Sequence, residues 1–311
     1  MTSIIKKVKI SGVGIHSGLP VNMVVKPSKK HGIFFKRIDV KGSDLIPATY
    51  DNVGETLMRN TTIGDKNGAH VQTIEHLMAA LFLAGINDAI IEIDDKETPI
   101  LDGSAFEFYN AFKNIVEKNK TMKKIIVKKT VIAHRNELAK NLRGWKKIKT
   151  IILNHTIWRH GNGFVKLSPN ANGLLIDATL VYPDKIIGTQ SFSCLIDESK
   201  KSINNFVKNI SRSRTFGKYS EWEWLKAHGM GRGANENNVI ALNDTGDGTL
   251  NKLIYPDEFV RHKIIDAVGD MFTSGGFVFG HLESYKGSHA LNNLVLRKLF
   301  SDKSNYEIVE E

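Results

Sequence analysis

One region of the sequence spaces a histidine and two carboxylates by single turns of a helix. His262 and Asp266 stand four residues apart, and Asp270 follows after another four. Residues at this spacing share one face of a helix, and a neutral imidazole beside a carboxylate can bind Zn²⁺ at ~2.0–2.2 Å. The spacing is equally typical of a surface pair that only stabilises its own helix, so it predicts a metal site only together with further ligands.

A second pair of polar residues interrupts an apolar run. Glu75 and His76 stand within Ile74–Leu81, which is otherwise apolar. Burying a carboxylate and an imidazole there costs several kcal/mol unless each finds a partner. One interpretation is a hydrogen-bonded, half-buried pair, and the other is a metal ligand beside a general base that activates water. The spacing is not the HExxH pattern of zinc proteases.

His289 is the third candidate, because it opens a predicted helix directly after Lys286-Gly287-Ser288. A helix N-terminus disfavours an imidazolium, but a nearby carboxylate such as Asp270 would restore its pKa. The histidine could then donate a proton to a leaving group. A purely structural histidine is the alternative.

The elements that must position these residues follow from hydrophobic periodicity. Apolar residues at helical spacing predict helices over 71–84, 258–272 and 289–300, and the acidic tail 306–311 is expected to fray. Strands and helices do not alternate strictly, which favours an α+β class over one doubly wound sheet. We predict an N-terminal α+β domain over 1–125, a basic connector with an insertion over 126–160 and a C-terminal α+β domain over 161–311.

Most of the positive charge lies in one stretch. The net charge is +10, and residues 118–160 hold 13 of the 43 lysines and arginines but one of the 33 acids. This segment offers an alternative function, nucleic-acid binding through phosphates. Trp145 and Trp158 are its only aromatic residues, so it lacks a stacking platform for bases. We therefore expect no specific nucleic-acid partner. Contact with an anionic membrane surface, at ~1 kcal/mol per basic residue, is a further hypothesis, and a solvated loop without a partner is its alternative.

The remaining composition predicts a soluble, cytoplasmic protein. Cys194 is the only cysteine, so an internal disulfide is impossible, as is usual in a reducing compartment. The longest apolar stretch, Leu77–Ile86, is far shorter than a membrane span, and no apolar run near the start is long enough for a signal peptide.

Six motifs, taken in order, resemble those of the UDP-3-O-acyl-N-acetylglucosamine deacetylases, zinc amidohydrolases that catalyse the committed step of lipid A biosynthesis. The resemblance covers roughly residues 3–130 and 160–300. The motifs are Gly12–Gly18, Thr73–Ala80, Pro99–Ser104, Ser213–Gly217, Glu258–Asp270 and Ser288–Asn293. It implies hydrolysis of the N-acetyl group of UDP-3-O-(3-hydroxyacyl)-N-acetylglucosamine, with release of acetate.

The resemblance also implies roles for individual residues. The zinc ligands would be His76, His262 and Asp266, with Glu75 as general base. The other site residues would be His289 as general acid or electrostatic partner, Asp270 orienting it, Thr215 at the oxyanion, Lys263 near the sugar nucleotide and Phe216 against the sugar.

The implied fold has two similar α+β domains, with helices sandwiched between two β-sheets. A βαβ insert in the second domain, at about 215–242, would form an acyl-chain passage. Its wall would include Trp222, Trp224, Leu225 and Met230, for which ordinary helix packing is the alternative. Two features depart from the family pattern: the Gly287-Ser288 order before His289, and an extra stretch at roughly 134–155.

Overall fold

The first sheet contains the strands of the N-terminal half. The structure is a computed structural model that describes residues 6–54, 60–116, 123–140 and 162–310. Along the second strand buried and solvent-facing side chains alternate, which is the pattern of a sheet with one covered face. All neighbours pair antiparallel except β7 and β3, which are parallel. The order is β1 (Val8–Val13), β2 (Pro20–Pro27), β7 (Asp88–Ile93), β3 (Gly32–Arg37) and β4 (Ile46–Pro47).

The second sheet has seven strands and gathers chain from both sides of the predicted connector. Its main path is β12 (Thr189–Ile196), β11 (Leu174–Val181), β15 (Phe277–Tyr285), β10 (Phe164–Ser168) and β9 (Val131–His134). Two further strands extend it: β8 (Lys124–Val127) pairs with β15, and β16 (Tyr306–Val309) pairs with β8. The long central strand β15 therefore holds the sheet together.

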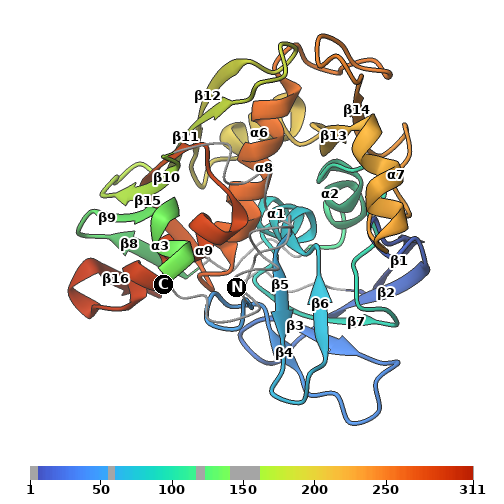
Figure 1. Cartoon of the computed structure of the whole chain (residues 1–311). Coiled ribbons are helices and arrows are strands. Elements are labelled where there is room, and N and C mark those ends of the chain that lie inside the picture. The colour runs from blue at the N-terminus through green and yellow to red at the C-terminus, as the bar shows by residue number, and fades with distance from the viewer. Residues whose placement is uncertain (1–5, 55–59, 117–122, 141–161, 311) are drawn as a thin grey trace.

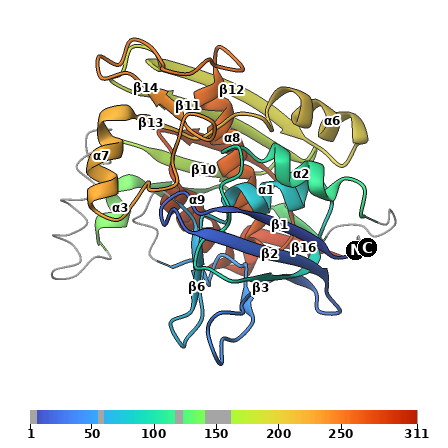
Figure 2. The same cartoon turned by 90° about the vertical axis from the view of Figure 1, so that its right-hand side faces the viewer.

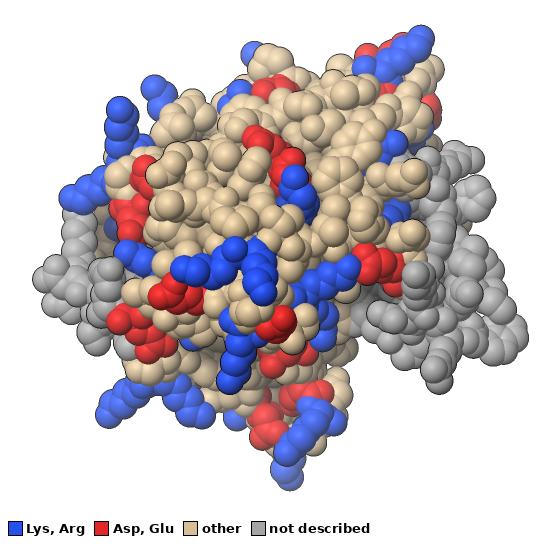
Figure 3. All heavy atoms as spheres, turned by 90° about the vertical axis from the view of Figure 1, so that its left-hand side faces the viewer, with Lys and Arg blue, Asp and Glu red and all other residues tan. Residues whose placement is uncertain are grey.

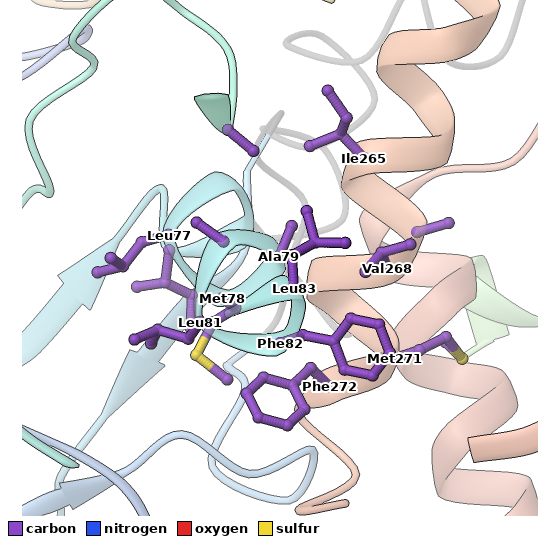
Figure 4. Close-up of a cluster of buried hydrophobic side chains, with 14 of the residues drawn as sticks. Leu77, Met78, Ala79, Leu81, Phe82, Leu83, Ile265, Val268, Met271 and Phe272 are labelled. Carbon is purple, nitrogen blue, oxygen red and sulfur yellow. The ribbon is translucent and has the colours of Figure 1, made fainter. Parts of the chain in front are cut away.

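The principal helices lie between the two sheets, as Figures 1 and 2 show for α1 (Glu75–Leu83) and α8 (Glu258–Phe272). Every residue of α1 is buried, as is usual for a helix that is apolar on all sides. Figure 4 shows its side chains packed against those of α8, with the rings of Phe82 and Phe272 5.6 Å apart. Other helices of the described residues are α2 (Phe106–Phe112), α3 (Arg135–Lys140), α6 (Lys200–Asn209) and α9 (His289–Phe300).

A short βαβ unit branches from the second half. Strands β13 (Phe216–Lys218) and β14 (Ile240–Leu242) pair in parallel around α7 (Tyr219–Ala227). This confirms the predicted α+β class, with helices between two sheets and a βαβ insert.

Two short strands of the first half pair with each other, β5 (Thr62–Gly64) and β6 (His70–Gln72). A 3₁₀ turn over Lys303–Asn305 precedes β16.

The structure corrects two element boundaries. The helix predicted from residue 71 begins at Glu75, because residues 70–72 pair with β5 and Thr73 adopts a left-handed φ of 61°. The tail predicted to fray forms β16, where Lys128 and Glu307 make a 2.7 Å ion pair across to the end of β8.

The predicted connector is described only as far as residue 140. Of that part, residues 126–127 end strand β8, residues 131–134 form β9, and 135–140 form α3. Residues 141–161, with Trp145, Trp158 and most of the apparent insertion, lie outside the described residues. Within the described part of the chain, no helix is both long and apolar enough to cross a bilayer.

Candidate metal and catalytic site

The crossing of α1 and α8 brings distant histidines together. His76 is on the first turn of α1, while His262 and Asp266 are one turn apart on α8. Helix α8 can approach so closely because it has glycine at position 269: a Cβ there would lie 2.0 Å from the carbonyl oxygen of Glu75. The two helices thus meet at the first turn of α1, where the polar residues stand.

Three buried side chains form a cluster of possible metal ligands, with one ligand atom each from His76, His262 and Asp266, all within 4.8 Å of one another. The Oδ1 atom of Asp266 lies 3.5 Å from Nε2 of His76 and 3.4 Å from Nε2 of His262. The two imidazole rings meet edge to face at 4.9 Å. The spacing seen in the sequence therefore belongs to a buried three-residue cluster rather than to a surface pair.

The chemistry of this donor set fits a divalent metal. Nδ1 of His262 lies 3.0 Å from the carbonyl oxygen of Ser213, so Nδ1 carries the hydrogen and Nε2 presents its lone pair to the cluster. Burial lowers the pKa of His262 to about 3, which keeps the imidazole neutral. Oδ1 of Asp266 is buried and has no hydrogen-bond partner among the described residues, as expected of an atom that serves as a ligand. Two nitrogens and one carboxylate oxygen suit zinc.

Glu75 lies beside the cluster with one oxygen fixed and the other directed inward. Oε2 accepts a 2.9 Å hydrogen bond from the backbone N–H of Thr61. Oε1 lies 4.0 Å from Nε2 of His289, which is too far for a hydrogen bond, so both atoms remain available to a reacting group beside them. Burial raises the pKa of Glu75, which makes its carboxylate a stronger base.

His289 approaches the cluster from the first turn of α9, whose N-cap is Ser288. Its Nδ1 donates to Oδ2 of Asp270 at 2.8 Å, and its Nε2 lies 3.8 Å from Oδ2 of Asp266. Burial alone would lower the pKa of His289, but the charges of Asp270, Glu75 and Asp266 outweigh it and raise the pKa to about 9. The predicted pairing of His289 with Asp270 is present, and it favours a protonated imidazole.

Two residues that sequence reasoning missed complete this network. Thr61 donates its hydroxyl to Oδ1 of Asp270 at 2.5 Å, and Asn292 donates its amide to Oδ2 at 2.8 Å. Asn292 has a local signal, since it follows His289 by three residues and so shares its helix face. Thr61 has none, because only the folded chain brings it to α8.

Lys263 and Phe216 border the cluster, and their expected places beside the sugar nucleotide stay predictions. Nζ of Lys263 donates to Oδ2 of Asp266 at 2.7 Å and lies 5.6 Å from the ring centroid of Phe216. That ring in turn lies 6.2 Å from the ring of His262. A pocket at this point is lined by Lys263, Asp266 and His289, together with Thr179 and Ser288.

Thr215 is held in place by its backbone. Its N–H donates to the carbonyl of Gly103 at 2.9 Å, and its carbonyl accepts from Ile240 at 2.8 Å. The loop before it is anchored by the buried carboxylate of Glu258, which accepts from both the backbone and the guanidinium of Arg214 at 3.0 Å. The part that Thr215 plays at an oxyanion stays a prediction.

Comparison with known proteins agrees with the motifs. A protein of Neisseria meningitidis serogroup A named UDP-3-O-acyl-N-acetylglucosamine deacetylase is 34% identical over 309 residues, spanning 98% of this chain and 91% of that protein. A protein of the same name from Saccharophagus degradans is also 34% identical over 309 residues, with 97% and 91% covered. The family model described as UDP-3-O-acyl N-acetylglycosamine deacetylase matches residues 1–301. Since that match spans nearly the whole sequence, this chain belongs to the UDP-3-O-acyl N-acetylglycosamine deacetylase family.

Proposed function

We propose that this protein is a zinc-dependent amidohydrolase that removes the N-acetyl group of UDP-3-O-(3-hydroxyacyl)-N-acetylglucosamine and releases acetate, the committed step of lipid A biosynthesis. The observation that carries the proposal is the buried cluster of His76, His262 and Asp266, flanked by Glu75 and His289. The relatives' names supply the substrate. A cytoplasmic location, as predicted from the sequence, is part of this proposal.

The side chains of the site divide the work of amide hydrolysis. His76, His262 and Asp266 would hold the zinc, which when bound polarises the acetamide carbonyl and eases the ionisation of water. Glu75 takes the proton of the attacking water at Oε1, since its other oxygen is occupied by Thr61.

The leaving amine needs a proton, and His289 is placed to give one. Its Nδ1 is committed to Asp270, so Nε2 faces the reacting atoms and transfers its proton to the sugar nitrogen as the C–N bond breaks. Asp270 fixes the ring and stabilises its positive charge. The hydroxyl of Thr215 would donate to the oxyanion, where a single donor is worth about 10²–10³ in rate.

The remaining contacts serve substrate binding. Lys263 offers a cation and Phe216 a ring face to the sugar nucleotide, and the insert would receive the acyl chain. Of its predicted wall residues, Trp222 is buried and packs in a small cluster with Val239 and Ala241. Trp224 is 48% exposed and stacks on His228 at 4.1 Å. The packing alternative therefore suits Trp222, whereas Trp224 leaves about half of its surface open to a ligand.

Acetate release from UDP-3-O-(3-hydroxyacyl)-N-acetylglucosamine tests the proposal. Glu75→Gln keeps the shape of the side chain and removes the base, so kcat should fall by about 10²–10⁴ while bound zinc stays near one per chain. Glu92→Gln is the matched control, since Glu92 pairs with Lys26 on the first sheet, and its kcat should equal that of the wild type. Full activity of Glu75→Gln would overturn the proposal.

The charge of the surface does not favour nucleic-acid binding as the main function. On the face in Figure 3, lysine and arginine side chains lie among aspartates and glutamates, so the visible charges do not form one positive field. The basic segment itself lies mostly in residues 141–161, outside the described part.

Contact of that segment with an anionic membrane surface remains our proposal for it, on the ground of its charge alone. Co-sedimentation with vesicles containing anionic lipid tests it. A variant with the basic residues of 140–149 neutralised should bind less than the intact protein, and equal binding would refute the idea.

A further inference from the structure

Glu97 is a buried carboxylate of the N-terminal half to which no role has been assigned. It is 0% exposed, and its two carboxylate oxygens accept hydrogen bonds from two separate segments of the chain. Oε2 accepts from the backbone N–H groups of His16 at 3.0 Å and Ser17 at 2.9 Å, and Oε1 accepts from the Thr73 hydroxyl at 3.0 Å. One buried side chain thus joins the glycine-rich turn after β1 to the residues that precede α1.

The glycine-rich turn is shaped to hold this carboxylate. A Cβ on Gly14 would lie 2.4 Å from Oε2 of Glu97, so the position must lack a side chain. The backbone N–H groups of His16 and Ser17 point at the carboxylate oxygens of Glu97 and form a concave anion-binding nest. This gives a physical reason for glycine at position 14 of the Gly12–Gly18 motif.

The same turn also supports the insert. The N–H groups of Arg232 and Gly233 donate to the carbonyls of His16 and Ile15 at 3.2 and 3.0 Å. A Cβ on Gly233 would lie 2.2 Å from the carbonyl oxygen of Gly14. The β1–β2 turn lies beside α7 in both cartoons (Figures 1 and 2). The turn that binds Glu97 is therefore also in contact with residues 232–233, which follow α7 in the chain.

On its other side Glu97 holds a residue in an unfavourable conformation. Thr73 has a φ of 61°, a region that β-branched residues rarely adopt. Its hydroxyl donates to Glu97 and accepts from the amide of Asn60 at 3.1 Å, and its carbonyl accepts from Thr98 at 2.5 Å. Glu75 follows two residues later and starts the helix.

We propose that Glu97 is a positioning residue for Glu75 and His76. Its hydrogen bond to Thr73 holds that residue in the left-handed conformation and so sets the direction in which the first turn of α1 enters the site. Its hydrogen bonds to the Gly14–Ser17 nest link this direction to the position of the insert. This inference rests on the proposed function, because it concerns the same metal cluster and base. A purely structural carboxylate would lower stability without selective effect on the site.

The test compares Glu97→Gln with the wild type in zinc affinity, measured by chelator competition, and in the kinetics of deacetylation. An amide presents N–H groups to the donors of the nest, so the clamp loosens. Loss of an outer contact of this kind reduces metal affinity or activity by about 10–100-fold. We expect zinc affinity and kcat to fall within that range, with KM changed less than about 3-fold. Glu92→Gln is the control and should match the wild type.

Rescue separates positioning from general destabilisation. Glycine adopts a positive φ without strain, so Thr73→Gly in the Glu97→Gln background should regain at least about 5-fold in zinc affinity. In the wild-type background the same substitution removes a hydrogen bond and should not improve it. A loss in Glu97→Gln that Thr73→Gly does not relieve overturns the proposal, and so does unchanged zinc affinity.

Two further arms keep the outcomes distinct. If Glu97→Gln does not fold by circular dichroism, Thr73→Val removes the same hydroxyl donor while leaving the nest intact. It must then weaken zinc binding by at least about 5-fold for the proposal to stand. A wild-type protein that binds zinc but releases no acetate refutes the proposed function, while the zinc-affinity comparison still decides the role of Glu97.

Discussion

Replacing Gly269 with alanine is expected to push apart the two helices that carry the metal cluster. The new Cβ would lie 2.0 Å from the carbonyl oxygen, 2.8 Å from the carbonyl carbon and 3.1 Å from the Cα of Glu75. These are backbone atoms, so no side-chain rotation can relieve the overlap. Reaching an ordinary contact of 3.4 Å requires a local separation of about 1.4 Å.

The separation has a cost in stability and a larger one in activity. Overpacking of a core by one methyl group typically costs about 1–3 kcal/mol, and the higher helix propensity of alanine returns about 1 kcal/mol. We therefore expect a net destabilisation of up to about 2 kcal/mol. A misplacement of about 1 Å between reacting groups reduces the rate by about 10²-fold, so kcat/KM should fall at least that far.

Urea denaturation and steady-state acetate release measure the two effects. Gly54→Ala is the matched control, because among the described residues its Cβ would meet only the Thr62 carbonyl oxygen, at 3.8 Å, and it should retain wild-type activity. Wild-type stability and kcat/KM in Gly269→Ala would refute the close crossing of α1 and α8 on which the geometry of the site depends.

Three further outcomes follow from individual contacts. Asp270→Asn removes the anion that holds His289, so kcat should fall by about 10–100-fold with the fold retained by circular dichroism; an unchanged kcat would show that His289 needs no such partner. Glu258→Gln leaves the part-buried Arg214 guanidinium without its anion and should cost about 3–5 kcal/mol in urea denaturation; a loss below about 1 kcal/mol would count against this ion pair. Burial raises the pKa of Cys194 to about 12, so at pH 8 its thiol stays protonated and should react with a disulfide reagent only after denaturation; rapid labelling of the native protein would contradict this.

Spacing found the parts of the site that lie within one helix. His262, Asp266 and Asp270 repeat at one-turn intervals on α8, and the adjacent Glu75 and His76 stand out because charge within an apolar run is costly. Both signals are local, so sequence alone carries them. The resemblance implied that His76 joins His262 and Asp266, and periodicity did not. This convergence depends on the crossing of α1 and α8.

Contacts between distant segments left no such signal. Thr61 and Glu97 are polar residues in irregular segments, and their partners stand on other elements, so nothing in their own neighbourhood marks them. The start of α1 was misplaced because pairing of β6 with β5 and the positive φ of Thr73 override the apolar periodicity from residue 71. The tail was misjudged because its partner, β8, lies about 180 residues earlier in the sequence.

Zinc titration of metal-free protein against acetate release tests the central claim most directly. Protein freed of metal with a chelator should release no acetate from UDP-3-O-(3-hydroxyacyl)-N-acetylglucosamine. Activity should rise in proportion to added zinc and level off at one equivalent per chain, because His76, His262 and Asp266 make one cluster. Asp266→Ala should stay inactive at the same zinc concentrations. Full activity of the metal-free protein, or of Asp266→Ala, would contradict the account.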